Sequence, residues 1–135
     1  FDAYATNVDR TARNPNMLHW HKRLWLIDHG AALYFHHTWD DYLKRSLSPF
    51  TPIKDHVLLL AARALPEAEA ELRSKLTPEA LAAIVNLIPD AWLGDEPRFA
   101  TPDAHRAAYV EYLLRRLEAS PIFVEEALRA RSPRL

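Results

Sequence analysis

Ten prolines are spread over this 135-residue chain, and three of those in its second half follow a threonine or a serine at the start of an apolar segment. The three pairs are Thr77-Pro78, Thr101-Pro102 and Ser120-Pro121. A hydroxyl side chain caps free N–H groups at a helix N-terminus, and proline is well tolerated in the first helical turn, where its missing N–H costs nothing. The pairs therefore predict three helix starts in the second half of the chain.

Apolar spacing extends the helical pattern over most of the sequence. Helices are predicted over 67–76, 77–93, 101–120 and 120–131. Apolar residues at helical spacing also predict a helix over 52–66 that Pro66 closes. Residues 31–47 read as a loop or a broken helix. The prolines thus separate helices and do not form a linker.

Two short runs near the N-terminus interrupt this pattern. Residues 17–20 and 23–28 are rich in Leu, Ile and Trp, and only His21 and Lys22 separate them. Such runs are typical of two strands joined by a tight turn, although this turn lacks the common Asn-Gly or Asp-Gly pair. We therefore expect a mainly α fold with one small antiparallel β-hairpin near the N-terminus, in a single domain over 1–135.

The first seven residues place Phe1, Tyr4 and Ala5 at helical spacing, as at the end of an amphipathic helix. The first residue is Phe and not Met. We therefore expect the chain to be a fragment whose upstream part is missing.

Composition excludes several classes of protein. The 17 basic and 18 acidic side chains nearly cancel, so the overall charge gives no direct signal of a nucleic-acid or membrane-surface partner. The chain has no cysteine for a disulfide or a thiolate zinc site, which fits a reducing compartment. No apolar run approaches the roughly 20 residues of a membrane span. We expect a cytoplasmic protein without a membrane segment.

Three polar residues, Asp9, Asn14 and Asp28, flank the predicted hairpin. A hairpin returns its end close to its start, so Asn14 and Asp28 could both aim oxygens at one ion. Mg²⁺ accepts one or two protein oxygens and leaves its other positions to water and phosphate. Phosphoryl transfer also needs a carboxylate that orients the attacking hydroxyl, and Asp9 is available for that role.

These residues carry a resemblance to a known family. The pattern D-R-x-x-x-N, a hairpin and then I-D-H-G resembles the catalytic and metal-binding loops of the protein-kinase-like superfamily, in the form found in phosphoinositide kinases and especially in HipA-like kinases. The resemblance implies that Asp9 is the catalytic aspartate and that Asn14 and Asp28 bind the Mg²⁺ of ATP. It covers residues 1–35, and it implies that the helices of 36–135 belong to a kinase C-lobe.

The chain departs from the family pattern at two positions. Thr11 stands where the lipid-kinase pattern usually has His, and His29 replaces the usual Phe of the metal-binding loop. Asn16 is a competing metal ligand, although the five-residue spacing from Asp9 favours Asn14.

Parts that a kinase uses to hold ATP are missing from the sequence. With two glycines there is no glycine-rich loop, and no strand carries a lysine that could pair with the phosphates. Both parts belong to an N-lobe that this chain lacks. We expect ATP-dependent phosphoryl transfer to a hydroxyl in the parent protein, with the acceptor unspecified. The fragment alone should be inactive and should self-associate or bind an N-lobe through apolar surface beside the hairpin.

Four cationic side chains and a single acid lie between residues 9 and 23, and this excess could attract phosphate. Arg10 lies directly beside the predicted site. Two roles remain open for it: to bind the phosphates of the cofactor, or to hold an acidic neighbour.

Two other functions remain open. One is a non-catalytic helical interaction module that keeps the loop residues as turn formers. The other is a metal-dependent hydrolase, although adjacent His36 and His37 cannot both point inward from a helix and no H-E-x-x-H motif is present. Its candidate ligands are His19, His21, His29, His36, His37, Asp28, Asp40 and Asp41.

Aromatic residues could form a stacking surface for nucleic-acid bases, but their leucine and isoleucine neighbours favour packing in the core. The residues concerned are Trp20, Trp25, Trp39, Trp92, Tyr34 and Phe35.

Overall fold

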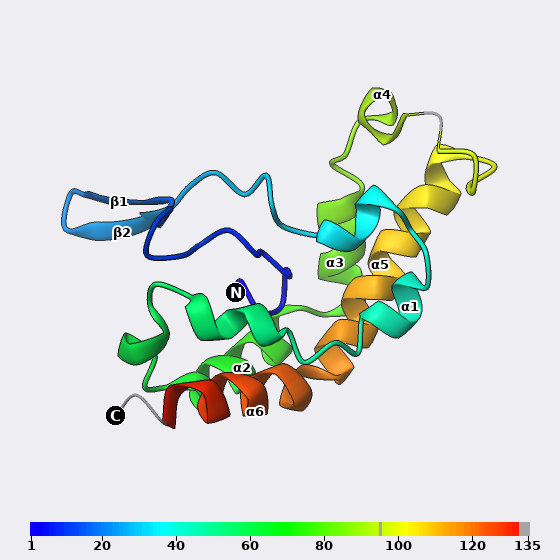
Figure 1. Cartoon of the computed structure of the whole chain (residues 1–135). Coiled ribbons are helices and arrows are strands. Elements are labelled where there is room, and N and C mark those ends of the chain that lie inside the picture. Colours follow the sequence, from blue (N-terminus) through cyan, green and yellow to red (C-terminus); the bar gives the residue numbers. More distant parts are fainter. Residues whose placement is uncertain (95, 133–135) are drawn as a thin grey trace.

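The computed structural model describes residues 1–94 and 96–132. Within them one antiparallel hairpin precedes a set of helices, so the predicted fold class is confirmed (Figure 1). The strands are β1 (Met17–Trp20) and β2 (Arg23–Leu26). The α-helices are α1 (Tyr42–Arg45), α2 (Leu65–Lys75), α3 (Pro78–Val85), α4 (Asp90–Leu93), α5 (Pro102–Glu118) and α6 (Ser120–Arg131). The 3-10 helices are η1 (Tyr34–His37), η2 (Thr51–Asp55) and η3 (Leu59–Ala61).

The hairpin lies where the sequence predicts it. The four residues of β1 pair in order with the four of β2, which leaves His21 and Lys22 as a two-residue turn. Both turn residues have positive φ, 48° and 60°, as a type I′ turn requires. Residues with a side chain rarely adopt this left-handed conformation, so the turn is strained.

Replacing Lys22 with glycine is expected to stabilise the hairpin by about 0.5–1 kcal/mol, because glycine adopts positive φ without a steric cost. Hydrogen exchange of the β1 and β2 amides measures the effect. The control is Ala70→Gly on the exposed side of α2, where the same residue is expected to cost about 1 kcal/mol. Equal destabilisation by both substitutions would contradict the turn geometry.

Two of the three predicted helix starts are capped as expected. The Thr77 hydroxyl accepts a hydrogen bond from the N–H of Ala80 at 3.1 Å, at the start of α3. The Thr101 hydroxyl accepts one from the N–H of Ala104 at 3.1 Å, at the start of α5. These local contacts explain why the helices begin where they do.

Ser120 starts α6 as predicted but does not cap it. It is the first residue of the helix and is fully buried. Its hydroxyl donates to Glu69 at 2.5 Å and accepts from Arg73 at 3.0 Å, and both partners belong to α2. The serine therefore joins α6 to α2.

The predicted helix over 52–66 is wrong. The segment forms η2 and η3, with His56 in an extended conformation between them, and Pro66 lies in the first turn of α2 instead of ending a helix. The apolar spacing was misleading because Ile53 and Leu59 enter the core from separate turns. The predicted helix over 77–93 is likewise divided into α3 and α4.

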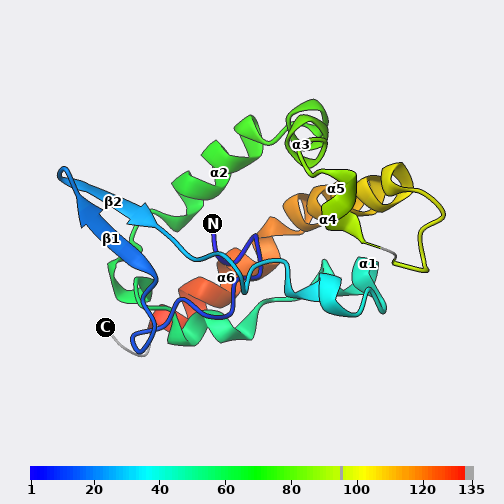
Figure 2. The ribbon, with the colours of Figure 1, turned by 90° about the horizontal axis from the view of Figure 1, so that it is seen from above.

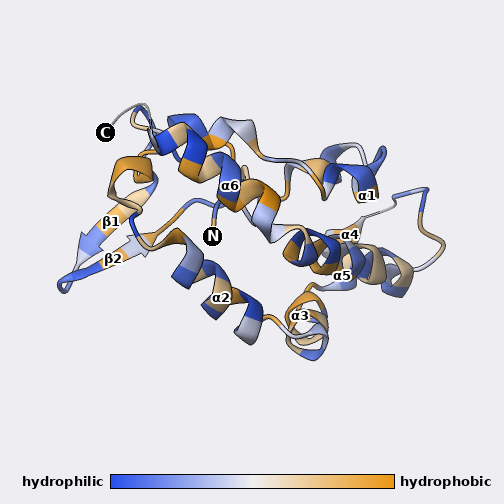
Figure 3. Ribbon diagram, turned by 90° about the horizontal axis from the view of Figure 1, so that it is seen from below, coloured by the Kyte–Doolittle hydropathy of each residue, from blue (hydrophilic) through white to orange (hydrophobic). Residues whose placement is uncertain are grey.

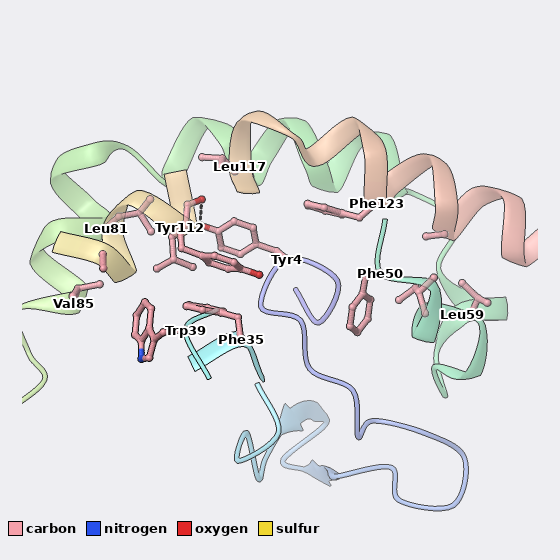
Figure 4. Packing of buried hydrophobic residues seen from close by; sticks show 14 residues of the cluster. Tyr4, Phe35, Trp39, Phe50, Leu59, Leu81, Val85, Tyr112, Leu117 and Phe123 are labelled. Atoms are coloured by element: carbon pink, nitrogen blue, oxygen red, sulfur yellow. Dashed lines mark hydrogen bonds between the residues drawn. The ribbon is translucent and has the colours of Figure 1, made fainter. Parts of the chain in front are cut away.

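Aromatic side chains occupy the centre of the core (Figure 4). Tyr112 of α5 stacks on Phe35 of η1 with ring centroids 3.6 Å apart, and Trp39 meets Phe35 edge-on at 5.1 Å. Tyr4 comes from a turn formed by residues 1–7, and its hydroxyl donates to the carbonyl of Leu113 at 3.1 Å. The core thus joins the start of the chain to α5.

Arg116 of α5 is completely buried and stacks over the Phe123 ring, 4.6 Å from its centroid. Burial lowers the pKa of Arg116 below its usual value. Its guanidinium donates to four main-chain carbonyls, those of Ala3, Tyr4, Ser46 and Ser48. One side chain therefore ties α5 to two segments that lie far apart in the sequence.

The hairpin projects from the helices, while α2 lies beside α6 and α3 beside α5 (Figures 1 and 2). The strands of the hairpin nevertheless carry hydrophobic residues (Figure 3). Leu18, Trp20 and Trp25 share one face of the hairpin in this register and are 52%, 61% and 46% exposed. We call these three residues the outer hairpin face.

The expectation of aromatic core packing is confirmed for Phe35 and Trp39, which are buried. It is wrong for four residues that the structure leaves exposed: Trp20, Trp25, Tyr34 and Trp92. Trp20 and Trp25 lie on a two-stranded sheet that projects from the helices (Figure 1). Tyr34 and Trp92 lie on short helices that bury the next residue, Phe35 in η1 and Leu93 in α4, and they themselves stay exposed.

Candidate functional site

The loop from Asp9 to Asn14 brings its two end residues together. The Asn14 side-chain amide donates to Asp9 Oδ2 at 2.6 Å. The loop is closed by the Asn14 N–H, which donates to the Thr11 carbonyl at 3.1 Å. Because Asn14 uses its Nδ2 on Asp9, its Oδ1 is the atom left to bind a cation.

Asp28 follows β2 at the open end of the hairpin and is exposed. Its φ is 50°, and Asn16, which precedes β1, has a φ of 45°. The two lie next to each other, since the Ile27 N–H donates to the Asn16 carbonyl at 2.9 Å. Asp and Asn tolerate the left-handed conformation better than most residues, and such strained positions cluster at functional sites.

Arg10 connects the two loops. Its Nη1 donates to the carbonyls of Asn16 and Ile27, and its Nη2 lies 3.1 Å from Nδ1 of His29. The residue after Asp9 therefore contacts the residues on both sides of Asp28. This contact places Asp9, Asn14 and Asp28 at the same end of the hairpin.

Arg10 takes the second of its two predicted roles and holds an acidic neighbour. Its Nε donates to Asp2 Oδ2 at 2.8 Å, and the arginine is 1% exposed. The structure therefore does not present the Arg10 guanidinium to a phosphate, as a cofactor-binding role would require. Arg13, another cationic residue of the same loop, is exposed.

Asp2 is the centre of a buried polar network. Asn7 donates to Asp2 Oδ1 at 3.0 Å, and His56 Nε2 lies 2.8 Å from Oδ2. Burial alone would raise the pKa of Asp2, but the hydrogen bonds from His56, Arg10 and Asn7 outweigh it and lower the pKa to about 2. The carboxylate is therefore charged at neutral pH.

No sequence pattern pointed to Asp2, Asn7 or His56. His56 lies 54 residues from its partner Asp2, and Asp and Asn are common in turns that have no functional role. Only the folded chain brings them together beneath Arg10.

Asn16 differs from Asn14 in its contacts. Its carbonyl accepts hydrogen bonds from Arg10 and Ile27, whereas its side-chain Nδ2 is buried without a partner in the described structure. Asn14 is the exposed residue and pairs with Asp9. This geometry favours Asn14 over Asn16 as the ligand beside Asp9.

The histidines do not form a metal centre within residues 1–94 and 96–132. There, no three His, Cys, Asp or Glu side chains are grouped so that they could hold a metal ion. His36 instead bonds to Tyr109, with 3.0 Å between its Nδ1 and the hydroxyl. The hydrolase alternative therefore has no geometric support, whereas Asp28 with Asn14 needs no third protein ligand if phosphate supplies the remaining oxygens.

A cavity of about 440 Å³ lies between α2, α6, η3 and the turn of residues 1–7. It is mainly apolar, and Asp2 and His56 reach its wall. Asp9, Asn14 and Asp28 do not line it. The candidate site is thus an exposed surface at the end of the hairpin and not this cavity.

None of the helices in the described part of the chain combines the length and apolar character needed to cross a bilayer. Comparisons with protein-family models, with curated proteins and with solved structures found no match.

Proposed function

We propose that this chain is the C-lobe of a cytoplasmic, HipA-like phosphotransferase that moves a phosphoryl group from ATP to a hydroxyl. The observation that most supports this is the joint placement of Asp9, Asn14 and Asp28. Asp9 and Asn14 share a hydrogen bond of 2.6 Å, and Arg10 contacts both neighbours of Asp28. The sequence motif names these three residues, and the contacts support the proposal because they join Asp9 to Asn14 directly and Arg10 to the two neighbours of Asp28.

The donor atoms of these residues suit magnesium. A carboxylate on Asp28 and an amide oxygen on Asn14 are hard oxygen ligands, and both side chains are exposed. Bound Mg²⁺ would neutralise charge on the transferring phosphates. Asp28 and Asn14 hold that ion, and Asp9 orients the acceptor hydroxyl and accepts its proton.

The outer hairpin face supports the two-lobe part of the proposal. An isolated two-stranded sheet is marginal in water, and exposed apolar patches tend to mark interaction sites. We propose that the N-lobe of the same protein covers this face and supplies the phosphate-covering loop and the lysine. The same exposed face is the observation that favours the second candidate, a non-catalytic interaction module.

The isolated chain is expected to bind Mg-ATP weakly and to show no turnover. Without the contacts of an N-lobe, Asn14 and Asp28 should give a Kd near 1 mM, about −4 kcal/mol. Calorimetry with Mg-ATP and a phosphate-release assay on the 135-residue chain test this. NMR line broadening by Mn²⁺ locates the ion and should be strongest at Asn14 and Asp28.

Micromolar Mg-ATP binding or steady turnover would show that the site is complete in this chain, and the two-lobe proposal would be abandoned. If Mn²⁺ does not broaden the NMR signals of Asn14 and Asp28, the result would favour the non-catalytic module. The Asp28→Asn chain is the matched control, since it keeps the shape of the side chain and loses its charge.

A further inference from the structure

We infer that Asp2 and His56 are positioning residues for the candidate site and that they act through Arg10. The inference rests on the function proposed above for Asp9 and Asp28. It assigns a role to the buried Asp2 and the partly buried His56, neither of which contacts Asp9, Asn14 or Asp28 in any hydrogen bond of the described structure.

The side of Arg10 that faces away from the site is held by Asp2. Arg10 Nε donates to Asp2 Oδ2 at 2.8 Å, while the two terminal nitrogens reach the carbonyls of Asn16 and Ile27 and the ring of His29. A guanidinium is planar and rigid, so fixing Nε fixes the directions of the other donors. Asp2 therefore sets where Arg10 holds the backbone around Asp28.

His56 fixes Asp2 in turn, and its ring has a defined tautomer. The Leu58 N–H donates to His56 Nδ1 at 3.1 Å, so Nδ1 is an acceptor and the proton lies on Nε2. Nε2 then donates to Asp2 Oδ2 at 2.8 Å. The carboxylate thus receives hydrogen bonds from His56 and Arg10 on the same oxygen.

The backbone beside His56 supports the catalytic loop as well. His56 forms an isolated antiparallel bridge with Thr11, and the Val57 N–H donates to the Arg10 carbonyl at 3.1 Å. The segment between η2 and η3 therefore contacts the Asp9 loop through its main chain and the Asp2–Arg10 pair through a side chain. This double contact explains why the segment is not a continuous helix.

The site needs such support because its backbone is strained. Asn16 and Asp28 both have positive φ, and strained residues persist only when the surrounding structure over-determines them. Arg10 contacts the Asn16 carbonyl and both neighbours of Asp28. Loss of the buried carboxylate contact should therefore release the open end of the hairpin before it unfolds the core.

Two substitutions of His56 separate positioning from simple packing. His56→Gln keeps a donor near the place of Nε2 and should preserve the bond to Asp2. His56→Asn keeps an acceptor near the place of Nδ1 for Leu58 but is too short to reach Asp2. The control is His105→Gln, at a buried histidine that stacks on Phe99 with ring centroids 4.5 Å apart.

The first measurement is amide hydrogen exchange in the 135-residue chain. His56→Asn is expected to speed exchange of the Asn14 and Ile27 amides about tenfold, with α5 amides unchanged, and His56→Gln should stay within about threefold of wild type. His105→Gln should speed exchange in α5 and not selectively at the hairpin end. The inference would be overturned if His56→Asn sped amide exchange equally at the hairpin end and in α5. It would also be overturned if His56→Gln failed to keep the Asn14 and Ile27 amides protected from exchange.

The second measurement is Mn²⁺ binding, followed by NMR line broadening at Asn14 and Asp28. His56→Asn should weaken it about tenfold and His56→Gln should restore it. If wild type binds no Mn²⁺ there, the proposed function fails while the exchange data still decide the positioning role. If Mn²⁺ binds wild type and both His56 variants equally, the positioning inference fails and the proposed function stands.

Discussion

Replacing Arg116 with methionine is expected to lower the free energy of unfolding by about 4 kcal/mol, a large share of the 5–15 kcal/mol typical of a domain. Methionine fills a similar volume but removes the donor that now satisfies four carbonyl groups, of which those of Tyr4 and Ser46 are buried and those of Ala3 and Ser48 are partly buried. Urea denaturation followed by circular dichroism measures the change.

Arg115→Met is the matched control. Arg115 is the neighbouring residue, is about half exposed and pairs with Glu111 at 3.4 Å, so its loss should cost no more than about 0.5 kcal/mol. Similar urea midpoints of unfolding for Arg116→Met and Arg115→Met would show that the carbonyl contacts of Arg116 add little to stability.

Asp28→Asn is expected to reduce Mg²⁺-dependent turnover by about a thousandfold or more in a two-lobe protein that contains this chain. The substitution removes the charge that we propose binds the metal but keeps the side-chain shape. Stability should change little, because Asp28 is exposed and asparagine tolerates its positive φ. Steady-state kinetics and thermal unfolding measured on the same sample separate the two effects.

Asp41→Asn provides the control for this experiment. Asp41 is also exposed and has a φ of 49°, but it lies before α1, away from the hairpin end in the sequence. Its substitution should leave turnover unchanged. An active Asp28→Asn enzyme would remove the central assignment of the proposed function.

Local signals in the sequence predicted much of this fold. The Thr-Pro pairs located α3 and α5 because an N-cap hydroxyl and the N–H that donates to it are only three residues apart. The hairpin followed from two short apolar runs with a two-residue gap. The prediction of a helix over 52–66 failed because the conformation of this segment depends on the contact between His56 and Asp2, which no local pattern reveals.

At the candidate site, too, contacts between residues close in the sequence could be predicted, whereas contacts between distant residues could not. The contact of Asp9 with Asn14 spans five residues and could be anticipated from their spacing. Burial of Arg10 depends on Asp2 on one side and on the hairpin carbonyls on the other. The sequence left two roles open for this arginine, and tertiary structure selects between them.

The tryptophans provide an optical signal without any added label. Trp20 and Trp25 lie on the outer hairpin face, whereas Trp39 is 4% exposed within the aromatic core. Indole emission responds to the polarity of its surroundings, so a partner that covers the hairpin should shift the fluorescence of the first two and leave the third as an internal reference. Trp92 of α4 is also exposed, so the measurement uses a Trp92→Phe chain. Quenching of that chain by iodide, before and after mixing with a candidate lobe, would then report on whether the outer hairpin face becomes protected from solvent.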